Sequence, residues 1–343
     1  MVEVHLLNRL RALAEHRRWL LGLAPTARFG HLTAALVAVQ GPALEARPEV
    51  IVQRRVTLPP DVRRGYGQLR RSRGRPLDVP LLAARLAECQ AALVDELAAE
   101  IAPVWQNISA VAIHGPGMSA QRSGLHGYAG LCDAARLADL TGLNVIDGFA
   151  ERDVAQDGRG MPLLALPYWV LLHDVRKLRA VVHVGRRVRA TFLHPRREAS
   201  AAFRTSCACQ ELAPRAVPAE VAIAIAGIIR TTALAGTRVD EVILCGGAAG
   251  QAVWDEMGAR LPDVRLVTVA DLGLPRGSLA AAAVAVLGQL HLDHVPASLP
   301  ALTGARTPRV LGRITPGSVV HWHRLVRELS ARRPNTVTLR SAI

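Results

Sequence analysis

Hydrophobic and polar positions along the chain alternate between short apolar runs and stretches with helical spacing. The short runs, typical of buried strands, lie at residues 19–23, 34–39, 108–114, 144–146, 180–184, 190–194, 241–245 and 264–269. Helical spacing or Ala/Leu-rich composition marks residues 3–18, 80–101, 130–140, 161–172, 219–232, 251–261, 278–290 and 321–332. The alternation predicts an α/β protein in which a strand–turn–strand unit opens each half.

The first of these units, WLLGLAPTARFGHLTAALVAVQG (residues 19–41), raises a question about its bend. Some ATP-using enzymes open with such a hairpin and grip phosphate through small residues, hydroxyls and an acid. This bend carries Pro25, Arg28 and Phe29 and contains no acid. The pattern alone leaves three interpretations open: a phosphate loop, one that has lost its chemistry, or an ordinary hairpin.

Composition narrows the class of protein. Half of the residues are hydrophobic but only 3% are aromatic, so Ala, Leu and Val must fill the core. No apolar run reaches the ~18–20 residues of a membrane span. The N-terminal stretch is charged throughout and lacks the apolar segment of a signal peptide, so we expect a cytoplasmic protein without membrane contact.

The formal charge of +14 raises the question of nucleic-acid binding. Lys177 is the only lysine, and the many arginines and alanines are typical of a GC-rich coding sequence. The one dense cluster, Arg63–Arg75, holds a single aromatic residue, Tyr66, which does not favour base stacking. Five cysteines form no CxxC pair. Neither a nucleic-acid partner nor a metal site is therefore expected.

Glycine-bearing turns follow several predicted strands. The chain has no GxxxxGK[ST] loop and no GxGxxG, GxSxG or HExxH motif. It does have His114-Gly115, Gly185-Arg186 and Gly246-Gly247 directly after strands. Backbone N–H groups at such turns can approach an anion. Three such turns in one α/β chain favour a nucleotide cleft between two halves.

The acids nearest to such a cleft are predicted to be Asp133, Asp147, Asp153 and Asp157. A sugar kinase needs one carboxylate to accept a hydroxyl proton and others to hold Mg²⁺. Asp153 stands out because two nearby glycines allow close backbone approach. The alternative is that these acids only stabilise local turns in solvent.

The segment TGLNVIDGFAERDVAQDGRGMPL, residues 141–163, resembles the block TGI-VV-DFRRRD-A-GGQGAPL of the anhydro-N-acetylmuramic acid kinase family. The downstream runs EVILCGGAAGQAVWDEMGARLP, SLPALTGA and VLGRITPG follow the family's order. His114-Gly115 matches the start of its HGQT motif, and Asp133 matches the acid of its QIGD motif. The resemblance covers residues 19–317.

This resemblance implies a two-domain actin-like, ribonuclease H-like fold with a cleft between the domains. It also implies ATP and Mg²⁺ as cofactors, and phosphorylation with ring opening of 1,6-anhydro-N-acetylmuramic acid in cell-wall recycling. A homodimer is compatible with it. The expected boundaries are an N-terminal helical extension at 1–18, domain I at 19–145, domain II at 146–317 and a C-terminal extension at 318–343.

The resemblance also assigns site residues. Those expected at the phosphates of ATP are Thr26, Gly30, Gly185, Gly246 and Gly247. Those expected at the sugar are His114, Asp133 and Asp153.

The departures from the family pattern fall on its chemistry. The first phosphate loop, SGTSxDGxD in the family, is APTARFGHLT here, with Phe29 at the first acid and Leu32 or Thr33 at the second. The loop NIGGIAN becomes HVGRRVRA, and DTGPGN becomes RTSCAC, which puts Arg204 at the catalytic aspartate. A guanidinium cannot accept a proton at any ordinary pH.

Three hypotheses follow. The leading one is a non-catalytic or catalytically impaired homologue that acts as a regulator or binds a muropeptide-like sugar or a nucleotide. The second is an active kinase in which Asp153 or Asp157 serves as substitute base. The third is a basic scaffold for acidic polymers, supported by the cluster Arg63–Arg75.

Overall fold

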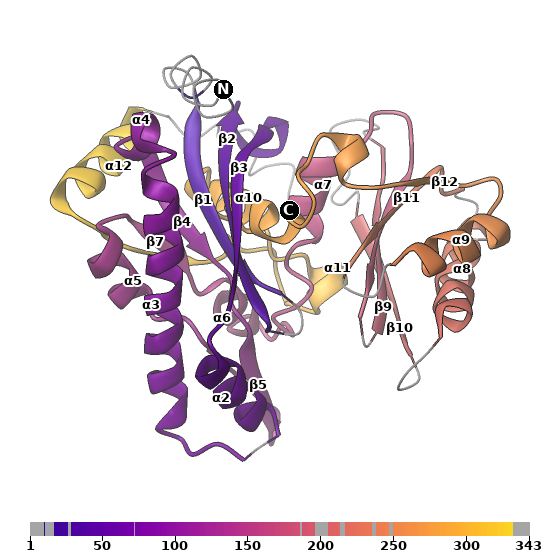
Figure 1. Cartoon of the computed structure of the whole chain (residues 1–343), viewed down its shortest axis with the longest axis horizontal. Helices are drawn as coiled ribbons and strands as arrows, with labels where there is room; N and C mark the ends of the chain where they lie inside the picture. The colour runs from indigo at the N-terminus through magenta and orange to yellow at the C-terminus, as the bar shows by residue number, and fades with distance from the viewer. Residues whose placement is uncertain are drawn as a thin grey trace. The chain divides into compact units, whose positions relative to one another are not determined.

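The computed structural model divides the chain into two compact units (Figure 1). Unit 1 comprises Met1–Leu164 and Gly277–Ile343, and unit 2 comprises Ala165–Arg276. The structure describes residues 10, 17–26, 29–71, 73–185, 187–195, 205–212, 217–234, 238–246 and 250–331. These units differ from the expected domains, since the expected boundary after residue 145 falls inside unit 1 and the chain returns to unit 1 at residue 277.

Unit 1 is built on a six-stranded sheet in the order β13-β7-β4-β1-β2-β3. Its strands are β1 (Arg18–Pro25), β2 (His31–Gln40), β3 (Arg47–Thr57), β4 (Ile108–Ile113), β7 (Val145–Asp147) and β13 (Arg313–Thr315). The first three form an antiparallel meander. β4 runs parallel to β1, and β7 runs parallel to β4. The hairpin predicted at residues 19–41 is confirmed.

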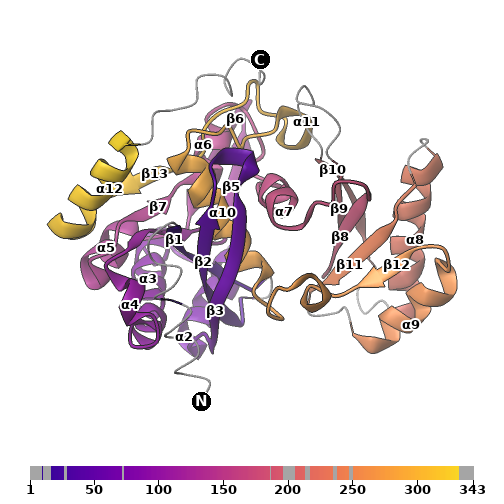
Figure 2. The same ribbon diagram turned by 90° about the horizontal axis from the view of Figure 1, so that it is seen from above.

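Helices cover both faces of this sheet (Figure 2). Those that pack on it or beside it are α2 (Pro60–Arg70), α3 (Asp78–Ala98), α4 (Ala102–Trp105), α5 (Ala134–Thr141), α6 (Phe149–Val154), α10 (Leu279–Leu292), α11 (Pro300–Thr303) and α12 (Val319–Ala331). Successive side chains of a strand point to opposite faces. Leu21 of β1 packs in the core that includes the α3 side chains, while a side chain at Gly22 would overlap the Ala281 carbonyl of α10. Gly22 therefore lets α10 lie directly on the sheet.

Unit 2 repeats the strand order of unit 1. Its sheet runs β10-β9-β8-β11-β12, formed by β8 (Arg179–Val184), β9 (Arg187–Leu193), β10 (Thr205–Glu211), β11 (Glu241–Cys245) and β12 (Arg265–Val267). β8, β9 and β10 form the antiparallel meander, and β11 and β12 continue in parallel beside β8. The helices are α7 (Ala165–Leu172), α8 (Pro218–Leu234) and α9 (Gln251–Arg260). A meander followed by parallel strands, present twice, confirms the predicted fold class, a two-domain actin-like (ribonuclease H-like) α/β protein.

The N-terminal end of β1 is tied to the C-terminal helix of unit 1. The guanidinium of Arg18 is fully buried and donates to Asp293 at 2.7 Å and to Glu328 of α12 at 2.5 Å. The predicted helix at 3–18 lies almost wholly outside the described residues, and Arg18 already belongs to β1.

Two stretches differ from the sequence prediction. The segment between residues 41 and 80, to which the sequence pattern assigned no element, contains β3 and α2. The helix predicted to begin at Gly130 begins at Ala134, because Asp133 caps it by accepting from the Arg136 N–H at 3.0 Å. Before it lies a hairpin of β5 (Gly117–Arg122) and β6 (Leu125–Gly130). Among the described residues, no helix is long and apolar enough to cross a lipid bilayer.

Candidate functional site

The candidate site of unit 1 lies at the carboxyl ends of its parallel strands, where α/β proteins place their ligands. The bend Thr26–His31 follows β1, His114 follows β4, and Asp147 ends β7. The backbone N–H of His114 donates to the Leu23 carbonyl at 3.4 Å, which joins the first two strand ends. Thr26 and Gly30, expected at the phosphates, and His114, expected at the sugar, therefore follow neighbouring strands of one sheet.

The bend is closed by Thr26. Its backbone N–H donates to the His31 carbonyl at 2.9 Å, and its Oγ1 accepts from the His31 N–H at 3.2 Å. The hydroxyl, expected to contact phosphate, therefore stabilises the turn itself. Gly30 has open space around it, because a Cβ added there would meet no atom within 4 Å.

Phe29, at the position of the family's first acid, is a core residue. Its side chain is only 2% exposed and stacks on Tyr66 of α2 with ring centroids 4.2 Å apart. Its φ of +54° is in the left-handed region, which bulky residues rarely adopt. Leu32 and Thr33, the two candidates for the second acid, are both buried in β2. The described part of this bend therefore offers no carboxylate to a ligand.

Asp153 is fully buried at the end of α6. Its carboxylate accepts from the hydroxyls of Ser298 at 2.5 Å and Thr303 at 2.8 Å, and from the Gly160 N–H at 2.9 Å. A side chain at Gly158 would overlap this carboxylate. These contacts make Asp153 a tie between α6 and the segment that contains α11. The glycines beside it serve this tie rather than a ligand.

Asp157, the other acid considered as a base, is exposed on the surface. Its side chain is 67% exposed and pairs with Arg306 at 2.8 Å. Its φ is +64°, a conformation that Asp tolerates better than most residues. Asp153 is thus inaccessible to solvent, whereas Asp157 lies exposed on the surface.

The residues expected at the sugar have different surroundings. His114 is half-buried with its ring edge-on to Phe149, at 6.4 Å between centroids. Burial lowers the pKa of His114 to about 4, so it is neutral at pH 7. Asp133 remains partly accessible, although it caps α5 and pairs with Arg136.

An ion pair that the sequence did not predict stands at the end of β7. Arg313 of β13 donates to both oxygens of the buried Asp147, at 3.0 and 2.9 Å. Gly148 follows with a φ of +70°. Asp147 was predicted from the sequence to be an acid near the cleft. Its partner Arg313 lies in β13, a strand far along the chain that pairs with β7. The carboxylate of Asp147 therefore links β7 to β13 at the edge of the sheet.

In unit 2 the glycine turns lie at the ends of β8 and β11. The Gly185 N–H donates to the Arg187 carbonyl at 3.2 Å within the β8–β9 turn. Gly246 has a φ of +102°, and a side chain there would overlap the Val184 carbonyl. The backbone thus requires the glycine at position 246 whether or not a phosphate binds, whereas a Cβ at position 185 would make only an ordinary contact with the Arg187 carbonyl at 3.8 Å. Gly247, Arg186 and Arg204 lie outside the described residues.

Next to these turns, Arg189 of β9 replaces the family's asparagine and lies opposite His183 of β8. Burial, aided by the Arg189 charge, lowers the pKa of His183 to about 4. Arg189 thus places a positive charge beside a neutral imidazole. The charge of Arg189 can attract an anion, but Arg186 replaces the second glycine of the family's loop.

The described residues do not form a Mg²⁺ site. No group of three or more His, Cys, Asp or Glu side chains among them could hold a metal ion. The carboxylates of Asp147 and Asp153 are engaged by protein donors, Asp147 by Arg313 and Asp153 by Ser298, Thr303 and the Gly160 N–H. Neither carboxylate therefore stands ready for a metal ion.

Comparison with known proteins agrees with the sequence resemblance. A family model described as anhydro-N-acetylmuramic acid kinase matches residues 21–210 and 207–317. The chain is 26% identical over 348 residues to the anhydro-N-acetylmuramic acid kinase of Cupriavidus pinatubonensis, covering 79% of this chain and 92% of that protein. It is 25% identical over 370 residues to the one from Bordetella parapertussis, covering 87% and 96%.

Solved structures give a weaker likeness. Component A of (R)-2-hydroxyglutaryl-CoA dehydratase from Acidaminococcus fermentans aligns with a TM-score of 0.38 at 10% identity, covering 78% of this chain and 96% of that one. A likeness at this level carries no inference about function. The family model, in contrast, spans residues 21 to 317, and the chain belongs to the anhydro-N-acetylmuramic acid kinase family.

Proposed function

We propose that this family member binds the anhydro amino sugar but does not phosphorylate it at the family's rate. The chain keeps the family's residues at the expected sugar positions and has lost several of them at the expected phosphate and catalytic positions, which supports this proposal. His114 and Asp133, the residues expected at the sugar, are both partly exposed in unit 1. The phosphate and catalytic positions carry Phe29, Arg186 and Arg204 in place of the family's residues.

The observation that carries the proposal is the burial of Phe29 against Tyr66. The family pattern has an acid at this position, whereas Phe29 here faces the core and packs against Tyr66 of α2. Removing one electrostatic group of an active site costs on the order of 10²–10³ in rate. Changes in both phosphate loops and at the catalytic aspartate together leave little expected turnover.

A rearranged active site receives no support from the two substitute bases. A general base must reach the proton that it abstracts and have a free lone pair. Asp153 is fully buried and accepts three hydrogen bonds, and Asp157 is exposed and paired with Arg306.

ATP and Mg²⁺ are the co-substrate and metal that family membership implies. The donor set of the described residues does not fit a Mg²⁺·ATP complex, because neither the bend after β1 nor the buried acids offer free carboxylate oxygens. We therefore assign no catalytic step to them in this chain.

Calorimetry with the anhydro sugar and with ATP·Mg²⁺, added separately, tests the proposal. The sugar is expected to bind without ATP, and binding should weaken in H114A but not in the matched H323A, which removes an exposed histidine of α12. Absence of sugar binding to a folded chain would refute the binding role. Tight ATP·Mg²⁺ binding would contradict the interpretation of the phosphate loops.

A further inference from the structure

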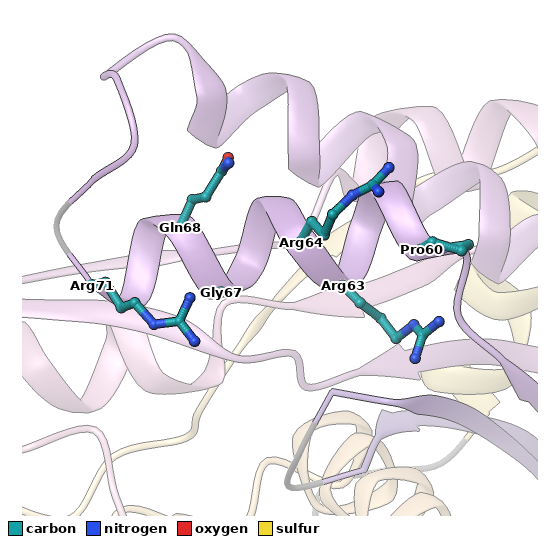
Figure 3. A pocket seen from close by; sticks show the side chains of 6 residues that line it. All are labelled: Pro60, Arg63, Arg64, Gly67, Gln68 and Arg71. Atoms are coloured by element: carbon teal, nitrogen blue, oxygen red, sulfur yellow. The ribbon is translucent and has the colours of Figure 1, made fainter.

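Helix α2 presents two different faces. Val62 and Leu69 are buried against unit 1, and Tyr66 stacks on Phe29. The outward face carries a hollow of about 450 Å³, shown in Figure 3. It is lined by Pro60, Arg63, Arg64, Gly67, Gln68 and Arg71.

The three arginines of this hollow have no ion-pair partner within the described residues. Some exposed arginines elsewhere on unit 1 are paired with acids, as Arg85 is with Glu88. The only acid of α2, Asp61, is contacted by that same Arg85 of α3. Three unneutralised guanidinium groups within nine residues create a local positive potential that pairing removes at other sites.

Gly67 adds a second, independent observation. A glycine inside a helix costs about 1 kcal/mol relative to alanine. Gly65 has a packing reason, because a side chain there would press on Leu82 of α3 at 3.3 Å. Gly67 has none, since the nearest atom to an added Cβ is the Arg71 guanidinium at 3.8 Å. In Figure 3 the side chain of Arg71 lies along the helix beside Gly67, where the missing side chain leaves room.

We propose that this face of α2 is a binding site for a linear chain of phosphate groups, separate from the sugar site. Arg63 and Arg71 are eight residues apart, so their Cα atoms are separated by roughly 12 Å along the helix axis. A guanidinium donates two parallel hydrogen bonds to one phosphate. This separation suits several consecutive phosphates better than a single inorganic ion.

The chemistry of the face favours a polymer without bases. Proteins that hold single-stranded nucleic acid stack the bases on accessible aromatic side chains. Tyr66, the one aromatic residue of α2, is stacked on Phe29 and faces inward. The outward face offers three guanidinium groups and the Gln68 amide, and no aromatic ring.

Binding of linear polyphosphate, measured by calorimetry across a range of salt concentrations, tests the proposal. Wild-type protein should bind it, with an affinity that falls steeply as salt rises. The variant R63Q/R64Q/R71Q should lose at least about tenfold in affinity, because charge-assisted contacts to phosphate are removed. Failure of wild-type protein to bind polyphosphate would overturn the proposal.

A matched variant separates a local site from overall charge. R122Q/R152Q/R309Q removes three exposed arginines from other elements and the same amount of charge. It should retain wild-type affinity, and an equal loss in both triple variants would overturn the proposal. G67A should weaken binding by filling the hollow while raising the melting temperature. Unchanged binding in G67A would contradict the hollow as the contact surface.

Two further ligands distinguish the chemical class and the site. A single-stranded oligothymidine of matched charge should bind more weakly than polyphosphate, and tighter binding would overturn the assigned ligand class. The anhydro sugar should bind equally well to wild type and R63Q/R64Q/R71Q. Loss of sugar binding in the triple variant would contradict a separate site, while the proposed sugar binding would still stand.

Discussion

Replacement of Phe29 by alanine is the most informative perturbation of the bend, because it separates a packing role from a ligand-binding role. The ring is almost completely buried and contacts Tyr66 at 4.2 Å between centroids. Removal of a buried Phe side chain usually costs about 3–5 kcal/mol in the free energy of unfolding. About 0.5–1.5 kcal/mol of this should be coupling to Tyr66, which a double-mutant cycle with Y66A measures.

The backbone conformation of Phe29 supplies a second test. With φ at +54°, any residue that has a Cβ is strained, and glycine is not. F29G should therefore be about 1 kcal/mol more stable than F29A, the reverse of the usual order.

Urea unfolding followed by circular dichroism measures these differences. A loss below about 1 kcal/mol in F29A would refute the packing role of the ring. F29A less stable than wild type but more stable than F29G would refute the strained backbone.

Three further predictions concern buried polar groups. D153N should lower the free energy of unfolding by about 2–3 kcal/mol, because it disrupts a buried carboxylate that accepts from three donors. D157N should change it by no more than about 0.5 kcal/mol, because the ion pair of Asp157 with Arg306 is exposed. Urea unfolding of both variants measures the difference. Burial lowers the pKa of His114 from 6.5 to about 4. Between these two pH values the imidazole is protonated in the unfolded chain and neutral in the folded chain. The stability from neutral His114 is therefore complete above pH 6.5 and lost as pH falls toward 4, and H114Q should flatten that part of a stability–pH profile. R18M should cost about 3–5 kcal/mol in unfolding experiments, because it leaves two carboxylates without their buried guanidinium; a cost below about 1 kcal/mol would contradict this.

The sequence predicts much of the fold because its core strands are short, apolar and bounded by glycine. The hairpin at 19–41 and the strand at 241–245 are examples. β3 was missed because its sequence, RPEVIVQRRVT, carries charges at the sheet edge, where one side of the strand is free. The helical spacing of Val62 and Leu69 in α2 was obscured by glycines and arginines.

The site was less predictable, because its residues acquire their roles from distant partners. Asp153 resembled a ligand-binding acid, but its donors Ser298 and Thr303 follow about 145–150 residues later. Phe29 could be recognised as a departure from the family pattern, whereas its stacking on Tyr66 required the placement of α2. The sequence specifies each side chain, but its hydrogen-bond partners and its burial depend on residues that only the fold brings close.

The bend after β1 lies at the position of the family's first phosphate loop, and we propose that it no longer supports phosphotransfer. A phosphotransfer assay with ATP, Mg²⁺ and 1,6-anhydro-N-acetylmuramic acid tests this most directly, beside a family member whose loop retains both acids. We expect a rate at least about 10³-fold below that of the family member, since several electrostatic groups are lost together. A rate within about tenfold of that enzyme would contradict it.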